Sequence, residues 1–200
     1  FRLRAGVKWH DGEPVTSRDV AFTIRNITDP DYRGDPTLAE GWLGADVTTP
    51  DDRTVVVKLR QPSAPFLARS ATIGILPEHL VGSLPTSEIE NAPFNAAPVG
   101  SGPYRVESLD AREARLVANG DYHLGRPQIE RFTLRFFTDY TTAQRALAEG
   151  EVEGLLIRDQ ISADQLSTLE QVKNTTAARL QRSTATLLYL NTSTALFSDE

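Results

Sequence analysis

The sequence predicts a mixed α/β (α+β) fold, with β-hairpins in the first part and alternating strands and helices in the second. Three observations lead to this prediction. Short segments of alternating apolar and polar side chains lie between Gly, Pro and Asp turns up to residue 118. From Arg131 onward, such segments are interleaved with segments of helical period, which is typical of α/β proteins. Hydrophobic residues make up 40% of the 200, so the chain can bury a core.

The first elements are a short strand, a turn and a helix. Apolar residues alternate with arginines over residues 1–4, which predicts a half-buried strand. The turn sequence Asp-Gly-Glu-Pro follows at residues 11–14. Thr16 is the expected N-cap of a helix, and Asp19, three residues on, completes a capping box. Asp29-Pro30 ends this helix because the residue before proline avoids the helical conformation.

The middle of the chain is expected to hold a hairpin and two short helices. Residues 47–59 alternate around a Pro-Asp-Asp-Arg turn, which predicts two paired strands. Short helices are expected at 65–70 and at 77–81, the second with proline at its first position. Residues 82–98 are rich in Pro, Gly and small polar residues, so we interpret them as a linker with the main boundary near Ala97.

The second half is expected to contain another hairpin and then alternating strands and helices. The hairpin covers residues 102–118, and a further strand covers 131–138. A helix at 141–149 is stopped by Gly150 in the C′ position. A strand at 152–157 precedes a helix capped by Ser162, with Gln165 closing the capping box. Strands are also expected at 177–181 and 185–190.

Composition excludes several classes of protein. The net charge of −6 argues against a nucleic-acid binder, which would carry a basic face. No apolar run approaches the roughly 18 residues that a membrane-spanning helix requires. The absence of cysteine removes zinc ribbons and cysteine nucleophiles, and no two of the three histidines have the spacing of a helical metal site.

Two motifs invite a catalytic interpretation that we do not favour. His10-Asp11-Gly12 is better explained as a turn after a strand, with His10 hydrogen-bonded within it. Gly100-Ser101-Gly102 lacks the spacing of a nucleophile elbow, and Pro103 follows it directly. The glycines there instead suit a close approach of two backbones.

Five segments, in this order, resemble family 5 of the extracytoplasmic solute-binding proteins of ABC importers. They cover most of the chain. Trp9 stands where the family more often has Phe. His123 stands where it more often has Trp, which leaves less aromatic surface at that position. The matching segments are FRLRAGVKWHDGEPVTSRDVAFTIR, PVGSGPYRV, LVANGDYHLGRPQIERFTLRFF, AQRALAEGEVEG and LLYLNTSTALFSDE.

The resemblance implies a class II periplasmic-binding-protein-like fold, a two-lobed clamp that closes on its ligand at a hinge. Residues 1–97 would supply a small accessory domain and one edge of the first lobe. Residues 98–186 would supply most of the rest of that lobe, and 187–200 the hinge strand toward a missing second lobe. Both ends of the sequence look cut, so we interpret the chain as part of a longer protein with one wall of the cleft. That exposed wall predicts self-association of the fragment.

The same resemblance implies a function in transport rather than catalysis. The protein would capture peptides or a similar small solute outside the membrane and deliver them to the membrane subunits of an ABC permease. It would lie in the periplasm or be lipid-anchored on the outer face of the cytoplasmic membrane. No cofactor, metal or catalytic residue is called for. A nickel or other small-solute binding protein of the same family, and an extracytoplasmic sensor domain, stay open as alternatives, whereas a hydrolase is not favoured.

The candidate ligand-binding residues lie where two expected strands end, because open sheets present ligands there. In the family, positions here line the cleft. Arg158 is a planar fork suited to a carboxylate, although Arg158 and Asp159 could equally be a solvated surface pair. Trp42 is either an aromatic lid over the ligand or a buried anchor of the small domain. Residues 184–189 also suit ordinary strand positions. The candidates are Trp42, Leu155, Leu156, Ile157, Arg158, Asp159, Thr184, Thr186 and Tyr189.

Overall fold

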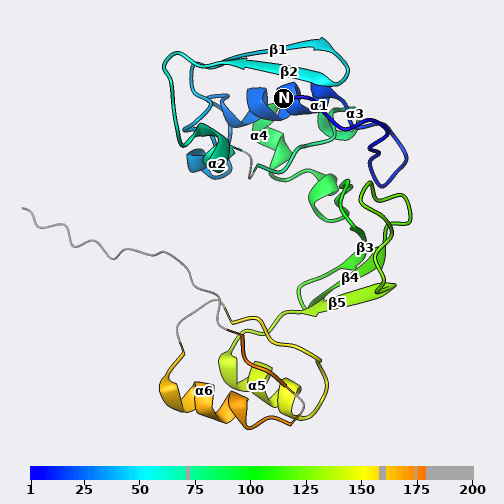
Figure 1. The fold of residues 1–200 in the computed structure, drawn as a ribbon, viewed down its shortest axis with the longest axis vertical. Coiled ribbons are helices and arrows are strands. Elements are labelled where there is room, and N and C mark those ends of the chain that lie inside the picture. The colour runs from blue at the N-terminus through cyan, green and yellow to red at the C-terminus, as the bar shows by residue number, and fades with distance from the viewer. Residues whose placement is uncertain (71–72, 158–160, 174, 179–200) are drawn as a thin grey trace, which may run out of the picture. The chain divides into compact units, whose positions relative to one another are not determined.

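The computed structural model divides into two compact units, residues 1–136 and 137–200 (Figure 1). It describes residues 1–70, 73–157, 161–173 and 175–178. The boundary expected near Ala97 falls inside the first unit, and the division lies after Phe136 instead. The assignment of 1–97, 98–186 and 187–200 to the domains of a clamp stays a prediction.

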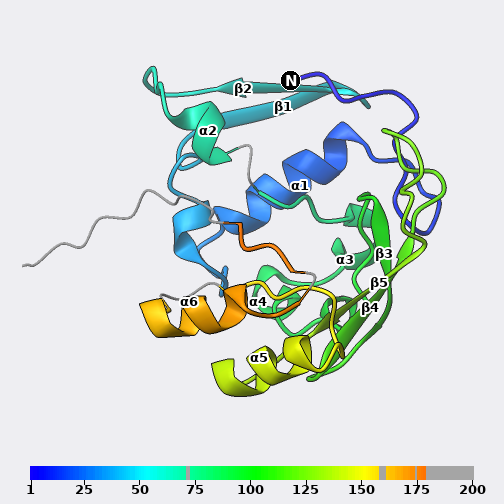
Figure 2. The same cartoon turned by 60° about the horizontal axis from the view of Figure 1, so that its bottom comes forward.

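The first unit is built around helix α1 (Ser17–Ile27), whose expected capping box is present. The Asp19 carboxylate accepts hydrogen bonds from the Thr16 backbone N–H at 2.7 Å and from its hydroxyl at 3.1 Å. The helix packs against the antiparallel hairpin β1 (Asp46–Asp51) and β2 (Thr54–Lys58) (Figures 1 and 2). The predictions of this helix and this hairpin are therefore confirmed.

The strand expected at residues 1–4 is only a single bridge, Arg2 to Thr54. Phe1 exchanges two backbone hydrogen bonds with Val55, at 2.7 and 2.9 Å, and the Leu3 N–H donates to the Arg53 carbonyl. The chain turns away at Gly6, whose φ of 73° suits glycine. The segment thus lies along the free edge of β2 for too few residues to form a regular strand.

Two clusters of buried side chains form the core of this unit. One contains Ile24, Ile27, Trp42 and Phe66, with the rings of Trp42 and Phe66 edge to face at 4.9 Å. The other joins Phe22 of α1 to two residues of the 76–98 region. Because α1 contributes to both clusters, it holds the hairpin on one side and the 76–98 region on the other.

Residues 82–98 are not the linker that their composition predicts. Two short elements lie in this region, α4 (Thr86–Ile89) and the 3₁₀ turn η2 (Pro93–Asn95). They follow α3 (Glu78–Val81), which confirms the short helix predicted at 77–81. Ile89 is buried against Phe22, so one apolar residue ties the segment to α1. Two short elements complete this part of the unit, η1 (Pro36–Leu38) and α2 (Phe66–Ser70).

A ridge of buried polar side chains on α1 also holds the 76–86 region. Asp19 accepts from the Glu78 backbone N–H at 2.9 Å, and the Thr23 hydroxyl accepts from the Leu76 N–H at 2.8 Å. Asn26 accepts from the Thr86 hydroxyl at 2.9 Å. All three α1 residues are at least nine-tenths buried. Because a buried donor without a partner is costly, these bonds fix where the irregular segment lies.

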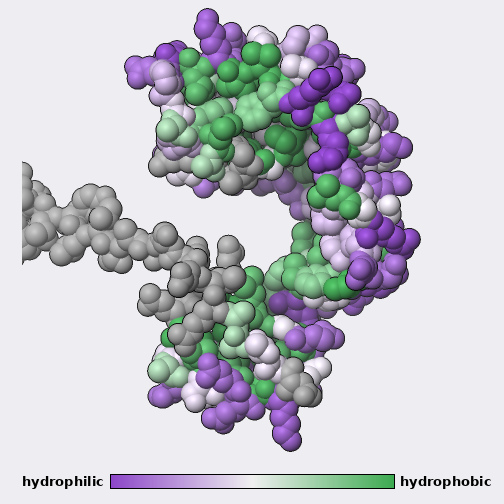
Figure 3. Space-filling model, in the orientation of Figure 1, coloured by the Kyte–Doolittle hydropathy of each residue, from purple (hydrophilic) through white to green (hydrophobic). Residues whose placement is uncertain are grey.

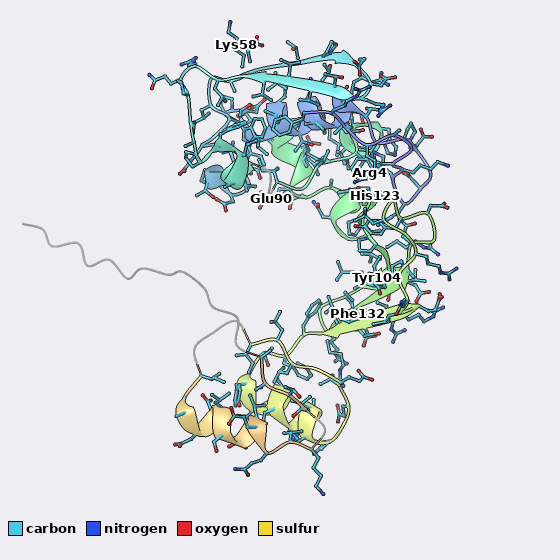
Figure 4. All side chains as sticks on the ribbon, viewed as in Figure 1. Arg4, Lys58, Glu90, Tyr104, His123 and Phe132 are labelled. Carbon is cyan, nitrogen blue, oxygen red and sulfur yellow. The ribbon has the colours of Figure 1, made fainter. Side chains whose placement is uncertain are left out.

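The unit ends in a three-stranded antiparallel sheet of β3 (Tyr104–Leu109), β4 (Glu113–Ala118) and β5 (Arg131–Arg135), in that order. Register places Phe132 opposite Leu116 and Leu134 opposite Ala114. The rings of Tyr104 and Phe132 lie side by side, 6.3 Å apart (Figure 4). Alternate residues carry charges, and Arg131 of β5 pairs with Glu107 of β3 at 2.7 Å. The sheet is therefore amphipathic.

The second unit contains the helices α5 (Tyr140–Ala148) and α6 (Ala163–Glu170), both close to their predicted bounds. Gly150 ends α5 with a φ of 74°, and Ser162 with Gln165 forms the expected capping box of α6. The Tyr140 hydroxyl donates to the Gln165 carbonyl at 3.1 Å and joins the two helices. The strand predicted at 152–157 is wrong, because these residues have no regular structure. The strands predicted at 177–181 and 185–190 fall largely or wholly outside the described residues.

Candidate functional site

Only part of the predicted ligand-binding wall lies among the described residues. Leu155 and Ile157 are half-buried, and Leu156 is 75% exposed, in the irregular segment between α5 and α6. Arg158, Asp159, Thr184, Thr186 and Tyr189 lie outside the described residues. Their role in ligand binding stays a prediction.

Trp42 lies in the core of the first unit, 6% exposed, in contact with Phe66. The packing matches the buried anchor, the second of the two roles considered for it. Among the described residues its indole N–H finds no hydrogen-bond partner, which is costly for a buried donor. A hollow of about 310 Å³ adjoins the ring and is lined by residues of α1 and of the 42–47 loop. The ligand role of Trp42 stays a prediction.

A second cluster forms where the turn after residues 7–9 meets the loop before β3. His10 donates its backbone N–H to the Gly100 carbonyl at 2.8 Å. The His10 ring contacts the same loop through both of its nitrogens. The Gly100 N–H donates to Nδ1 at 3.2 Å, and Nε2 lies 3.1 Å from the Gly102 carbonyl oxygen. The Asn119 amide donates to the same carbonyl at 3.0 Å. One side chain thus joins two segments that are 90 residues apart.

Asp11, the next residue, forms an ion pair of the same turn with α3. Its carboxylate lies 2.7 Å from Nε2 of His79 and accepts from the Glu13 N–H at 3.2 Å. Burial acts to raise the pKa of Asp11, but the hydrogen bonds from His79 and Glu13 outweigh it and hold the pKa below its ordinary value. The turn therefore contacts two other segments. His10 is hydrogen-bonded to the 100–102 loop, and Asp11 pairs with His79 of α3.

A hollow of about 180 Å³ lies beside this cluster. His10, Asp11, Arg105 and Glu107 bring charged or polar groups to its wall, and residues 96–99 supply small apolar ones. Within the described ranges, no three His, Cys, Asp or Glu side chains come together as metal ligands. The contacts beside this hollow are hydrogen bonds from His10 to the 100–102 loop and an ion pair from Asp11 to α3.

The prediction that His10 is hydrogen-bonded within its own turn is wrong, because its ring bonds to Gly100 and Gly102 instead. The 100–102 glycines were expected to allow a close approach of two backbones, but the sequence did not indicate that His10 lies there. The close approach is confirmed by the 2.8 Å hydrogen bond from the His10 backbone N–H to the Gly100 carbonyl, and a Cβ on Gly100 would make a tight contact of 3.3 Å with the His10 ring. The sequence did hold a signal, since both segments belong to the two motifs that carry the family resemblance most clearly.

The family's sequence profile, described as bacterial extracellular solute-binding proteins, family 5 middle, matches residues 1–200. The chain belongs to this family. Its fold is accordingly that of a family 5 periplasmic binding protein, which confirms the predicted family and fold class. The family consists of substrate-binding proteins rather than enzymes.

Individual relatives agree with this membership. A Brucella ovis protein, named as an ABC transporter peptide-binding protein, is 39% identical over 155 residues, which are 76% of this chain and 29% of the relative. The structure of the oligopeptide-binding protein AppA from Bacillus subtilis, in complex with a nonapeptide, matches with a TM-score of 0.74 and 28% identity. That match covers 86% of this chain and 34% of AppA.

A third match is to a protein that binds a different kind of ligand. NikZ from Campylobacter jejuni, in complex with Ni(L-His), matches with a TM-score of 0.68 and 25% identity over 76% of this chain and 30% of NikZ. In all three cases the chain spans about a third or less of the relative's length. Within the described residues, no helix has both the length and the apolar character to cross a membrane.

Proposed function

We propose that the protein containing this chain captures peptides outside the cytoplasmic membrane and delivers them to an ABC permease. The observation that carries this proposal is the match to AppA with its bound nonapeptide, which covers 86% of the chain. The Brucella ovis relative, named for peptide binding, supports the same substrate class. We propose a location in the periplasm or on the outer face of the membrane, which the family description supports.

The mechanism we propose is closure of two lobes around the ligand, followed by docking on the membrane subunits. Ligand binding shifts the population toward the closed state because the closed state makes more contacts with the ligand. Backbone hydrogen bonds would hold an extended peptide, and roomy pockets would accept its side chains. We expect no catalytic turnover, so a screen of ester and peptide substrates would stay blank.

Within this mechanism, the wall we propose for the ligand comprises two groups, residues 155–159 and residues 184, 186 and 189, with Trp42 as a further candidate. Arg158 would pair with a ligand carboxylate through two parallel hydrogen bonds. Its replacement, Arg158→Ala, should weaken peptide binding about 10- to 100-fold, since charge-assisted bonds are among the strongest. Arg126→Ala is the matched control, because Arg126 is exposed and pairs only locally with Glu130.

A second candidate function is the binding of a nickel complex or another small solute, which the match to NikZ favours. Native mass spectrometry of the full-length protein, purified without refolding, separates the two. A carried-over mass that fragments into amino acids supports the peptide function, and a metal-chelate mass supports the nickel function. An empty protein that also ignores a peptide mixture would contradict the transport proposal while leaving the fold intact.

Self-association of the isolated 200-residue stretch stays a proposal that the comparisons do not support. What favours it is the row of half-exposed apolar side chains on and after β5, with Phe132, Leu134 and Phe136 at 44%, 44% and 48% exposure. Figure 3 shows hydrophobic residues reaching the surface over this sheet. A monomeric mass by light scattering at high concentration would contradict the proposal.

A further inference from the structure

We propose that His10 is a proton-sensitive clasp, whose neutral imidazole accepts a hydrogen bond from the Gly100 N–H in the loop before β3 and whose protonation breaks that bond. This inference goes beyond ligand capture and does not depend on which solute the protein binds. It rests on the hydrogen bonds that the two ring nitrogens make.

The partners of the ring fix the position of its proton. The Gly100 backbone N–H, 3.2 Å from Nδ1, can only donate, so Nδ1 must be the acceptor. The Gly102 carbonyl, 3.1 Å from Nε2, can only accept, so Nε2 must carry the hydrogen. The contacts therefore assign the neutral Nε2–H tautomer.

Protonation is incompatible with this arrangement. An imidazolium carries a hydrogen on both nitrogens and has no acceptor, so the Gly100 N–H would face another N–H. The bond to Gly100 would be lost, whereas the bond to Gly102 would survive. The Asn119 amide also donates to the Gly102 carbonyl, so Gly102 keeps a second hydrogen bond.

The charged groups near His10 come from its own turn and from β3. The 98–103 loop and Asn119 carry no charged side chain. The charged groups nearby are Asp11, whose carboxylate already pairs with His79, and Arg105 and Glu107, which share a hollow with His10. His10 is half-buried, so solvent protons reach it.

The clasp acts at a junction of the first unit. Along the chain, the loop follows α3, α4 and η2 and precedes the β3–β5 sheet, which begins at Tyr104. The His10 N–H donates to the Gly100 carbonyl, so ring and backbone hold the same residue from both sides. A side chain at residue 100 would crowd the ring, since its Cβ would lie 3.3 Å from His10 Cε1. Loss of the Nδ1 bond would therefore loosen Gly100 on one side, while the backbone bond to its carbonyl stays.

The first test is to read the tautomer by ¹⁵N NMR of ring-labelled histidine in the full-length protein near neutral pH. We expect His10 as the Nε2–H form with an unprotonated, hydrogen-bonded Nδ1. His79→Gln and His123→Asn assign the other two signals of this region without touching His10. An Nδ1–H tautomer at His10 would overturn the proposal, whatever the variants do.

The second test measures hydrogen exchange of the Gly100 amide as a protection factor, relative to an unstructured amide at each pH. Protection should fall about tenfold from neutral to acid pH, because protonation of the ring removes one hydrogen bond. His10→Asn offers an acceptor near the Nδ1 position and does not titrate, so its Gly100 protection should change less than about twofold. His123→Asn, which removes an exposed histidine elsewhere, should behave as the unsubstituted protein. An equal fall in His10→Asn would contradict the proposal.

Discussion

The first unit contains two antiparallel sheets that look alike in sequence and differ in what covers them. The β1–β2 hairpin is backed by α1, and its Val55 is 1% exposed. The β3–β5 sheet has the same alternation, yet Phe132 and Leu134 are each 44% exposed. Alternation thus predicts that one face is apolar, but a second element decides whether that face is buried.

The largest effect should come from the core beside the covered hairpin. Trp42→Ala removes a ring packed against Ile24, Ile27 and Phe66 and should lower the free energy of unfolding by about 3–5 kcal/mol. Phe132→Ala, on the other sheet, should cost only about 1–2 kcal/mol because half of that ring already meets solvent. Urea denaturation of the full-length variants measures both.

This pair of variants also sharpens the comparison of the sheets. Equal costs at Trp42 and Phe132 would mean that another part of the full-length protein covers β3–β5. A small cost at Trp42 would contradict its role as the anchor of the hairpin core.

A medium effect is expected from the polar ridge of α1. Asp19→Ala leaves the backbone N–H groups of Thr16 and Glu78 without their acceptor and should destabilise the protein by about 2–3 kcal/mol. Asp35→Ala is the matched control, since Asp35 also caps a helical turn, with the Thr37 N–H at 2.9 Å, but is exposed. We expect a clearly smaller loss from it. Thermal melting of both variants tests this, and similar losses would show that the burial of Asp19 is unimportant.

The smallest effect should come from the Asp11–His79 pair. The pKa of Asp11 is lower in the folded chain, so its carboxylate adds stability above about pH 3.9, its unfolded value, and this contribution is lost as the pH falls through the lowered folded value. Because the pair is about 30% exposed, the contribution should stay below about 1 kcal/mol. Asp11→Asn should remove it.

A double-mutant cycle of Asp11→Asn and His79→Gln, followed by urea denaturation between about pH 3 and pH 6, isolates this pair. Coupling that disappears at acid pH supports the assignment. Coupling that is independent of pH would contradict it.

Local signals in the sequence predicted much of the fold correctly. The α1 capping box, the two hairpins and the stop of α5 at Gly150 each depend on residues within a few positions of one another. The failures were of another kind. Residues 82–98 have the composition of a linker but form short helices, because Ile89 finds Phe22 in the folded unit. Residues 152–157 have the pattern of a strand, but no strand within the described ranges pairs with them.

The candidate site divides in the same way. The sequence predicted a turn at His10 and Asp11 and a close backbone approach at the 100–102 glycines, because turn chemistry and backbone freedom are properties of the local chain. Family membership, too, was determined by the sequence, since five motifs in order identify it. Only the tertiary structure brought His10 to Gly100 and Asp11 to His79, and buried Trp42 beside Phe66. Contacts between residues 24 to 90 positions apart depend on how whole elements pack, and residue spacing along the chain carries no record of that packing.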